Sequence, residues 1–138
     1  MIVVAIIGLL AALAVPSFRM YVVRAHGSEG LYFVSAYKVQ LAEQIMLTGR
    51  IPDDAGDPAN VDYYETGGSG VVRRVRWSRQ RAALEVWYGS DAGSELNGAI
   101  LWLIPHLGAD GGVAWTCRGH PDADFYMNPA YLPSTCRG

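Results

Sequence analysis

The sequence predicts an α+β fold, in which one long N-terminal helix packs through its second half against a four-stranded antiparallel sheet. Residues 1–18 are almost entirely apolar and carry no charge. Residues 18–48 keep a helical repeat of apolar side chains, and four short β-rich runs follow in the part that holds most of the 16 glycines and 7 prolines. A chain of 138 residues with a net charge of −2 is long enough for one domain and is not generally basic.

The first segment, residues 1–18, is apolar on every side of a helix, so lipid or other chains must cover it. It is at the lower limit for a membrane span, which needs about 20 residues. A cleaved signal peptide is an alternative, because residues 12–14 have the small side chains of a cleavage site. However, no basic residue precedes the run, and the helical pattern continues past Pro16. We expect residues 1–22 to form a projecting apolar helix and residues 23–138 to form a globular headgroup.

Residues 18–48 continue the helix with one apolar face. Its members are Leu31, Val34, Leu41 and Ile45. Lys38 falls within this face, where it can snorkel at the edge or pair with an acid of another chain. Gly27 and Gly30 each weaken the helix by about 1 kcal/mol relative to alanine, and Gly49 is expected to end it. The complete helix would be about 70 Å long, longer than such a domain is wide, so part of it projects.

Residues 50–70 have the composition of a loop, with glycine, proline and several acids. The acids are Asp53, Asp54, Asp57, Asp62 and Glu65. The first three, or Asp122 and Asp124 near the C-terminus, offer oxygen ligands for calcium. Neither group has the spacing of a recognised calcium loop, so solvated turn acids are the favoured interpretation.

Four β-rich runs follow this loop and span residues 70–117. They are Gly70–Trp77, Ala82–Gly89, Ala99–Pro105 and Gly112–Cys117. The short polar turns between them favour antiparallel hairpins. In the second run, an apolar face alternates with Glu85 and Trp87, which predicts one face on the helix and one toward solvent or a neighbour. Residues 100–104 are apolar on both faces and predict a central strand.

The N-terminal third has the sequence MIVVAIIGLLAALAVPSFRMYVVRAHGSEGLYFVSAYKVQLAEQIMLTGRIP, in which MIVVAIIG…AA.AVP is a highly specific motif. This stretch resembles the N-terminal helix of a type IV pilin of the a class. The resemblance implies the type IV pilin fold and a structural subunit of a pilus. It also implies that a leader cut by a prepilin peptidase, and about six mature residues that include an N-methylated Phe and a Glu, are missing here. Those residues would bring the apolar segment to the usual length of a membrane span.

The resemblance further implies that the chain waits in the bacterial inner membrane and then enters an extracellular filament of pilins, added by an assembly machinery. The functions that the resemblance suggests for this filament are adhesion, twitching motility and DNA uptake. The residues expected to pack in the filament core are Ile2, Val3, Ile6, Ile7, Leu9, Leu10 and Leu13. Pro16 weakens the preceding helical turn, and the resemblance implies that the helix unwinds between Gly8 and Pro16 in the filament.

The cysteines, Cys117 and Cys136, enclose a loop that is rich in proline and glycine. Two free buried thiols are one interpretation. A disulfide is favoured because the chain has the features of an exported protein, and closing a loop of this length stabilises by about 3 kcal/mol. The resemblance implies a C-terminal loop closed by the same disulfide, and this loop contributes subunit contacts. Phe125 and the loop prolines are candidates to pack it on the sheet.

A run of five arginines lies near Trp77. Its members are Arg73, Arg74, Arg76, Arg79 and Arg81. Basic residues interleaved with an aromatic ring can bind a nucleic-acid backbone, so DNA is a candidate partner. Ion pairs with the upstream acids or with a neighbouring subunit are the favoured alternative, because balanced local charges leave little field beyond about 8 Å.

Two alternatives to a pilus subunit with a purely structural role remain within the same family. One is a minor pilin that binds DNA for transformation, and the other is a type II secretion pseudopilin, against which the C-terminal cysteine loop argues. An exported enzyme is a remote third. No catalytic or nucleotide-binding motif is present, and His26, His106 and His120 lack metal-ligand spacing. We therefore expect no enzyme activity, no cofactor and no metal site.

Overall fold

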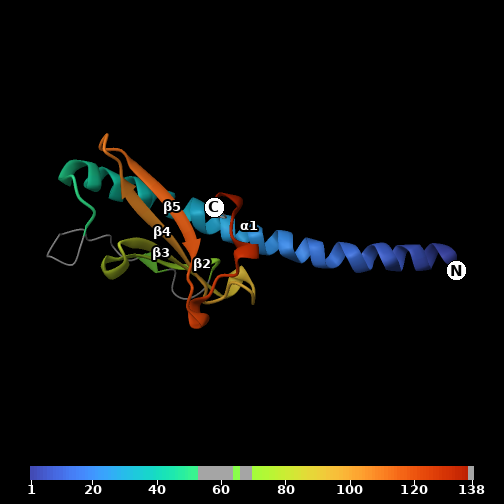
Figure 1. Cartoon of the computed structure of the whole chain (residues 1–138). Coiled ribbons are helices and arrows are strands. Elements are labelled where there is room, and N and C mark those ends of the chain that lie inside the picture. Colours follow the sequence, from blue (N-terminus) through green and yellow to red (C-terminus); the bar gives the residue numbers. More distant parts are fainter. Residues whose placement is uncertain (53–63, 66–69, 137–138) are drawn as a thin grey trace.

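The fold combines one long helix with one antiparallel sheet, as Figure 1 shows for the computed structural model. The structure describes residues 1–52, 64–65 and 70–136. The helix is α1 (Ile2–Thr48). The strands are β1 (Tyr64–Glu65), β2 (Val72–Ser78), β3 (Ala83–Tyr88), β4 (Ile100–Leu107) and β5 (Val113–Gly119), which lie in the order β1-β2-β3-β4-β5. The predicted α+β class is confirmed.

The four longer strands coincide with the four predicted runs, and β1 is a fifth strand that was not predicted. It has two residues, Tyr64 and Glu65, which pair with Val75 and Arg74 of β2. So short a strand has no alternating pattern that could reveal it within a segment of loop composition. The loop expected at residues 50–70 and the calcium ligands considered at Asp53, Asp54 and Asp57 otherwise lie largely outside the described residues.

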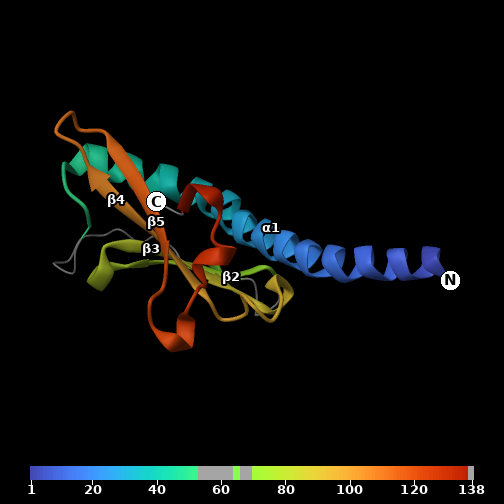
Figure 2. The same cartoon turned by 45° about the vertical axis from the view of Figure 1, so that its right-hand side comes forward.

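The helix α1 is continuous and passes through both Gly8 and Pro16. It ends as expected at Gly49, which has a left-handed φ of 70° and donates its N–H to the Ile45 carbonyl over 2.8 Å. Every residue up to Tyr21 is exposed. In Figures 1 and 2 most of this half of the helix extends away from the sheet.

The second half of α1 packs on the inner face of the sheet. Its buried residues are Val23, Gly27, Gly30, Val34, Leu41 and Ile45. They meet inward side chains of β2, β3 and β4, and these buried residues form one continuous core. Three of the four residues of the predicted apolar face are fully buried, and Leu31 is half-buried.

A close contact between α1 and β3 gives Gly30 a role beyond weakening the helix. The Tyr88 hydroxyl donates a hydrogen bond of 2.7 Å to the Gly27 carbonyl. A Cβ placed on Gly30 would lie only 2.8 Å from Cζ of the same ring. The missing side chain of Gly30 therefore lets Tyr88 reach the helix backbone.

The outer face of the sheet, which points away from α1, is more buried than the sequence suggested. Glu85 of β3 is only 2% exposed, and Ala83, Ile100 and Trp102 form a second small core with Phe125 packed against it. The segment that follows β5 covers part of this face, so the expectation of an outer face open to solvent or a neighbour is only partly met. The burial expected on both faces of residues 100–104 is confirmed for residues 100–103, and Ile104 is half-buried. As expected, β4 lies inside the sheet, between β3 and β5.

Lys38 is accommodated within its own chain. Its ammonium lies 5.4 Å from the centre of the Trp115 ring on β5. This cation–π contact lets the long side chain stay at the edge of the apolar face.

Candidate functional site

Two surfaces stand out on this fold, and the first is the uncovered half of α1, residues 1–21, which we term the apolar helix surface. It includes the seven residues expected in a filament core, whose exposed fractions range from 52% for Ile6 to 77% for Ile2. Monomeric soluble proteins rarely expose so large a continuous apolar area. This helix is also long and apolar enough to cross a membrane, and none of its most apolar window is buried within the chain.

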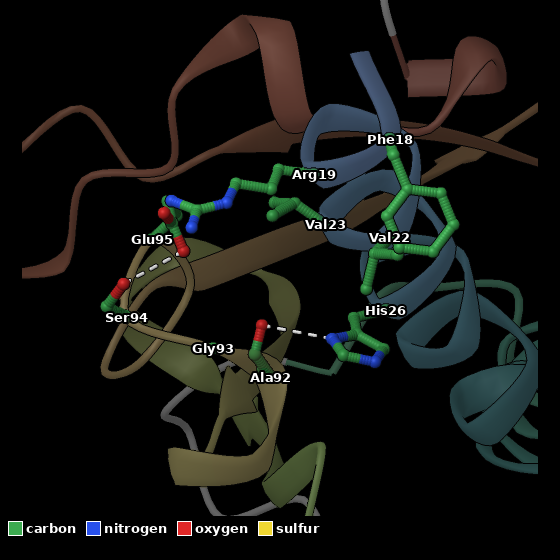
Figure 3. Close-up of a pocket in the computed structure, with 9 residues that line it drawn as sticks. All are labelled: Phe18, Arg19, Val22, Val23, His26, Ala92, Gly93, Ser94 and Glu95. Carbon is green, nitrogen blue, oxygen red and sulfur yellow. Dashed lines mark hydrogen bonds between the residues drawn. The ribbon is translucent and has the colours of Figure 1, made fainter. Parts of the chain in front are cut away.

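A groove lies where the apolar helix surface meets the headgroup (Figure 3). Phe18, Val22 and Val23 line it on the helix side, and residues 92–95 line it on the sheet side, with a volume of about 370 Å³. The two sides are joined by a hydrogen bond of 3.1 Å from His26 Nδ1 to the Ala92 carbonyl. Phe18 is 68% exposed, so the groove continues the apolar surface to the base of the headgroup.

Arg19 and Glu95 bring opposite charges to the rim of this groove, where Figure 3 shows their side chains close together. Hydrogen bonds from the Glu95 backbone and from the Ser94 hydroxyl lower the pKa of the Glu95 carboxyl, and the nearby Arg19 adds to the effect. The rim thus carries an ionised carboxylate beside a cation at neutral pH.

The second surface lies on the outer face of the sheet, and we term it the arginine–tryptophan face. Its members are Arg74, Arg76, Arg81, Arg118, Trp87 and Trp102. The guanidinium carbons of Arg74 and Arg76 lie 4.6 and 5.1 Å from the centre of the Trp87 ring. Those of Arg81 and Arg118 lie 4.7 and 5.2 Å from the centre of the Trp102 ring. Each indole therefore carries two guanidinium groups.

Strand register explains how residues far apart in the sequence meet on this face. Arg76 pairs with Glu85, Glu85 with Trp102, and Trp102 with Arg118, so one row crosses β2 to β5. Arg76 Nε donates to Glu85 Oε2 over 2.6 Å, and Trp87 Nε1 donates to the same oxygen over 3.2 Å. The buried carboxylate is thus balanced by the guanidinium of Arg76.

The predicted arginine run does not act as one unit. Arg74, Arg76 and Arg81 contribute to the arginine–tryptophan face, and Arg73 lies at an irregularity in the β2–β3 register. The side chain of Arg79 lies outside the described residues. Arg118 was missed, because it belongs to a separate run and only the pairing of β4 with β5 brings it to Trp102.

Cys117 and Cys136 form a disulfide, and the loop that they enclose packs against the outer face of the sheet. Phe125 meets the Trp87 ring edge-to-face at 5.1 Å, and His120 meets the Trp102 ring at 4.4 Å. The same loop also contacts the helix, because Arg24 of α1 donates a hydrogen bond of 2.9 Å to the Ala130 carbonyl. The loop therefore links the helix with the sheet.

His120 is buried within this loop and is 4% exposed. Its Nδ1 accepts a hydrogen bond of 3.1 Å from the Asp122 backbone N–H, which places the ring proton of the neutral form on Nε2. Burial lowers the pKa of His120, while the Asp122 carboxylate partly opposes this shift. Across residues 1–52, 64–65 and 70–136, no three histidine, cysteine or acidic side chains are grouped as metal ligands.

The apolar helix surface has no cover within the chain, and it adjoins a sheet headgroup with a disulfide-closed loop. A family model described as pilin, a bacterial filament, matches residues 23–137. The chain belongs to the pilin family, and its role is that of a structural subunit of a pilus.

Curated relatives extend the similarity over the apolar helix surface. A fimbrial protein from Eikenella corrodens, EcpC, is 31% identical over 148 residues, which cover 99% of this chain and 85% of that protein. A fimbrial protein from Pseudomonas aeruginosa is 30% identical over 146 residues, covering 99% and 90%. The type IV major pilin protein PilE1 from Neisseria gonorrhoeae is 27% identical over 163 residues, covering 99% and 82%. The resemblance to a type IV pilin, stated from the sequence, is confirmed.

Proposed function

We propose that residues 1–22 form the inner part of the pilus, where neighbouring helices cover the apolar helix surface, and that residues 23–138 form the headgroup outside it. The observation that carries this proposal is the exposure of every residue up to Tyr21 in a run without charge before Arg19. Before assembly, lipid would cover the same residues in the inner membrane. Exchange of lipid for helices then stabilises the filament through packing, because both surroundings are apolar.

The family resemblance supplies the other partners in this proposal. A prepilin peptidase would process the chain, and an assembly machinery would transfer it from the membrane to the filament. Adhesion and twitching motility would follow from the exposed headgroup and from the filament as a whole.

Gly8 and Pro16 mark a segment of α1 that we propose to unwind in the filament. Pro16 has no backbone N–H, so the Ala12 carbonyl lacks its regular helical donor. Nothing lies within 4 Å of a Cβ placed on Gly8, so no packing within the chain supports this part of the helix. The segment can therefore open without disturbing the headgroup.

A charge placed on the apolar helix surface tests the main proposal. Leu10→Asp in the full chain is expected to abolish pili in negative-stain micrographs, because an aspartate in an apolar surrounding costs about 3 kcal/mol. Asn97→Asp, on the exposed surface of the headgroup, is the matched control and should leave pili unchanged. Cell fractionation separates a defect in membrane insertion from one in assembly. Normal numbers of pili with Leu10→Asp would overturn the proposal.

We propose DNA as a second candidate partner, because the arginine–tryptophan face points away from α1. If the helix lies inside the filament, this face points outward and is repeated in every subunit. Binding to phosphates should weaken strongly with salt. The full chain in detergent is expected to bind DNA at low salt, and Arg74→Ala with Arg76→Ala should reduce the affinity. Unchanged affinity in this double variant would argue against a role for these two arginines.

A secretion pseudopilin is the remaining alternative. The disulfide-closed C-terminal loop favours a pilus subunit over it. Deletion of the gene distinguishes the two, because loss of surface pili with intact protein secretion supports the pilus, whereas loss of secretion with intact pili supports the pseudopilin.

A further inference from the structure

The guanidinium groups of Arg81 and Arg118 converge on one buried indole from two different elements. Arg81 ends the short 3-10 helix after β2, and Arg118 lies in β5. Both side chains belong to exposed residues, whereas the Trp102 ring between them is only 3% exposed. The His120 ring, packed edge-to-face at 4.4 Å, holds the indole from the side of the disulfide loop. The indole is thus a rigid support for two cations.

These two cations differ from the neighbouring Arg76, whose charge is balanced by Glu85. Within the part of the chain that the structure describes, neither Arg81 nor Arg118 has an ion-pair partner. A guanidinium that stacks on a ring keeps its N–H groups directed outward along its edge, in a planar fork that suits a phosphate. The ring therefore supports two preorganised guanidinium groups, each of which can bind an anionic group.

A groove beginning at Arg118 extends this site along the disulfide loop. Its volume is about 440 Å³, and Pro121, Tyr126 and Pro129 are among the residues that line it. Tyr126 is 50% exposed, so its ring is open to a ligand. A guanidinium fork and an open aromatic ring in the same groove match the alternation of phosphate and base along a single strand of nucleic acid. A duplex does not present the faces of its bases in this way.

We infer that Arg81 and Arg118 bind phosphates of single-stranded nucleic acid, and that an adjacent base stacks on Tyr126. This inference rests on the DNA partner proposed above and moves the contact from the arginine run of β2 to a site shared by two elements. In a filament the site recurs in every subunit, so one strand that spans several copies gains avidity.

Fluorescence polarisation with a labelled oligo-dT of about 12 nucleotides tests the site on the full chain in detergent. Arg81→Ala and Arg118→Ala are each expected to lower the affinity about fivefold or more, and to reduce the salt slope by about 0.7 for each phosphate that is no longer neutralised. Tyr126→Ala should lower the affinity about tenfold without changing the salt slope. Arg50→Ala, at the end of α1, removes an equal charge elsewhere and should have little effect.

The indole N–H signals provide a second readout that does not depend on substitutions. On titration with the oligonucleotide, the Trp102 signal should shift, whereas that of Trp77, buried on the inner face of the sheet, should stay. Circular dichroism verifies that each variant is folded.

The outcomes separate this site from the broader DNA proposal. If oligo-dT binds but Arg118→Ala and Tyr126→Ala bind equally well, the site is wrong and the DNA partner stands. If neither oligo-dT nor duplex DNA binds at low salt, both fail. If an acidic polysaccharide binds through Arg81 and Arg118 and oligo-dT does not, the nucleic-acid assignment is overturned.

Discussion

At the scale of single residues, one tyrosine joins the helix to the sheet. Tyr88 of β3 is 1% exposed, and its hydroxyl donates a hydrogen bond to the Gly27 carbonyl of α1. Burial raises the pKa of this hydroxyl, with a further contribution from Glu29, so the group keeps its proton at any pH that the headgroup experiences. Gly30 leaves the space that the ring occupies. The glycine at position 30 therefore weakens an isolated helix but stabilises the packed one.

Gly30→Ala is predicted to destabilise the headgroup by about 1–3 kcal/mol, because its Cβ would displace the Tyr88 ring. This loss opposes the gain of about 1 kcal/mol that alanine brings to a helix. Thermal melting of the full chain in detergent measures the difference. Gly8→Ala is the matched control, since its Cβ meets nothing within 4 Å, and it should not lower the melting temperature of the headgroup. A stabilised Gly30→Ala variant would contradict this account.

His120 is predicted to make the stability of the headgroup depend on pH. Its pKa is lowered by burial from the ordinary value of 6.5, so the unfolded chain binds a proton more readily than the folded one. Stability is then fully present above pH 6.5 and falls as the pH drops toward the lowered folded value. Protonation also removes the acceptor for the Asp122 N–H. Denaturant unfolding at several pH values measures this loss.

His120→Gln should flatten the pH dependence over this range. The control is His106→Gln, which alters an exposed histidine that is hydrogen-bonded to Thr116 at 2.8 Å, and it should retain the dependence. An identical slope in His120→Gln and the unaltered chain would refute the role of His120.

At the scale of elements, the disulfide-closed loop connects α1, β5 and the outer face of the sheet. The Cys117–Cys136 disulfide joins the end of the loop to β5. Arg24 of α1 donates a hydrogen bond to the Ala130 carbonyl, and Phe125 packs against Trp87 on the outer face of the sheet. The only regular structure between β5 and Cys136 is three short 3-10 helices, so the conformation of the loop depends on these three attachments.

Replacement of both Cys117 and Cys136 by serine is predicted to destabilise the headgroup by about 3 kcal/mol and to reduce the number of pili. Thermal melting of the full chain under oxidising and reducing conditions checks the first part, and electron microscopy of cells checks the second. The double serine variant should melt at the same temperature in both conditions. Equal melting of the unaltered chain in both conditions would show that the disulfide adds no stability.

At the scale of the whole molecule, two parts of one helix belong to different surroundings. The headgroup half of α1 is buried by its own chain, whereas the apolar half finds no cover within it. The boundary between the two halves lies near Val23, the first residue of the helix with a buried side chain. The stability of the headgroup should therefore be nearly independent of the apolar half.

Pro16→Ala is predicted to strengthen the apolar half of the helix by up to about 3 kcal/mol, because it restores a backbone donor. Amide hydrogen exchange of the chain in micelles should slow around residues 13–17, while the melting temperature of the headgroup stays the same. If the segment unwinds in the filament, pili of this variant should extend less under force. Val15→Ala is the control, and equal extension in both variants would argue against the unwinding.

Much of this architecture could be predicted from local sequence patterns. The end of α1 at Gly49, the four longer strands and the buried faces of β4 follow from repeats and turn residues within short windows. The apolar surplus of residues 1–18 also indicated cover from outside the chain. Each of these features depends on side chains that are close together in the sequence.

Tertiary structure alone decided the features that depend on contacts between distant residues. β1 is too short to have a pattern, and Gly30 gains its role only when Tyr88 packs beside it. The arginine–tryptophan face likewise depends on strand register, which brings Arg118 of β5 to the ring that Arg81 also covers. The sequence by itself therefore determined the helix, the four longer strands and the need for an outside partner. The packing of those elements determined which side chains share a surface, because register and loop attachment are settled by contacts across the whole fold.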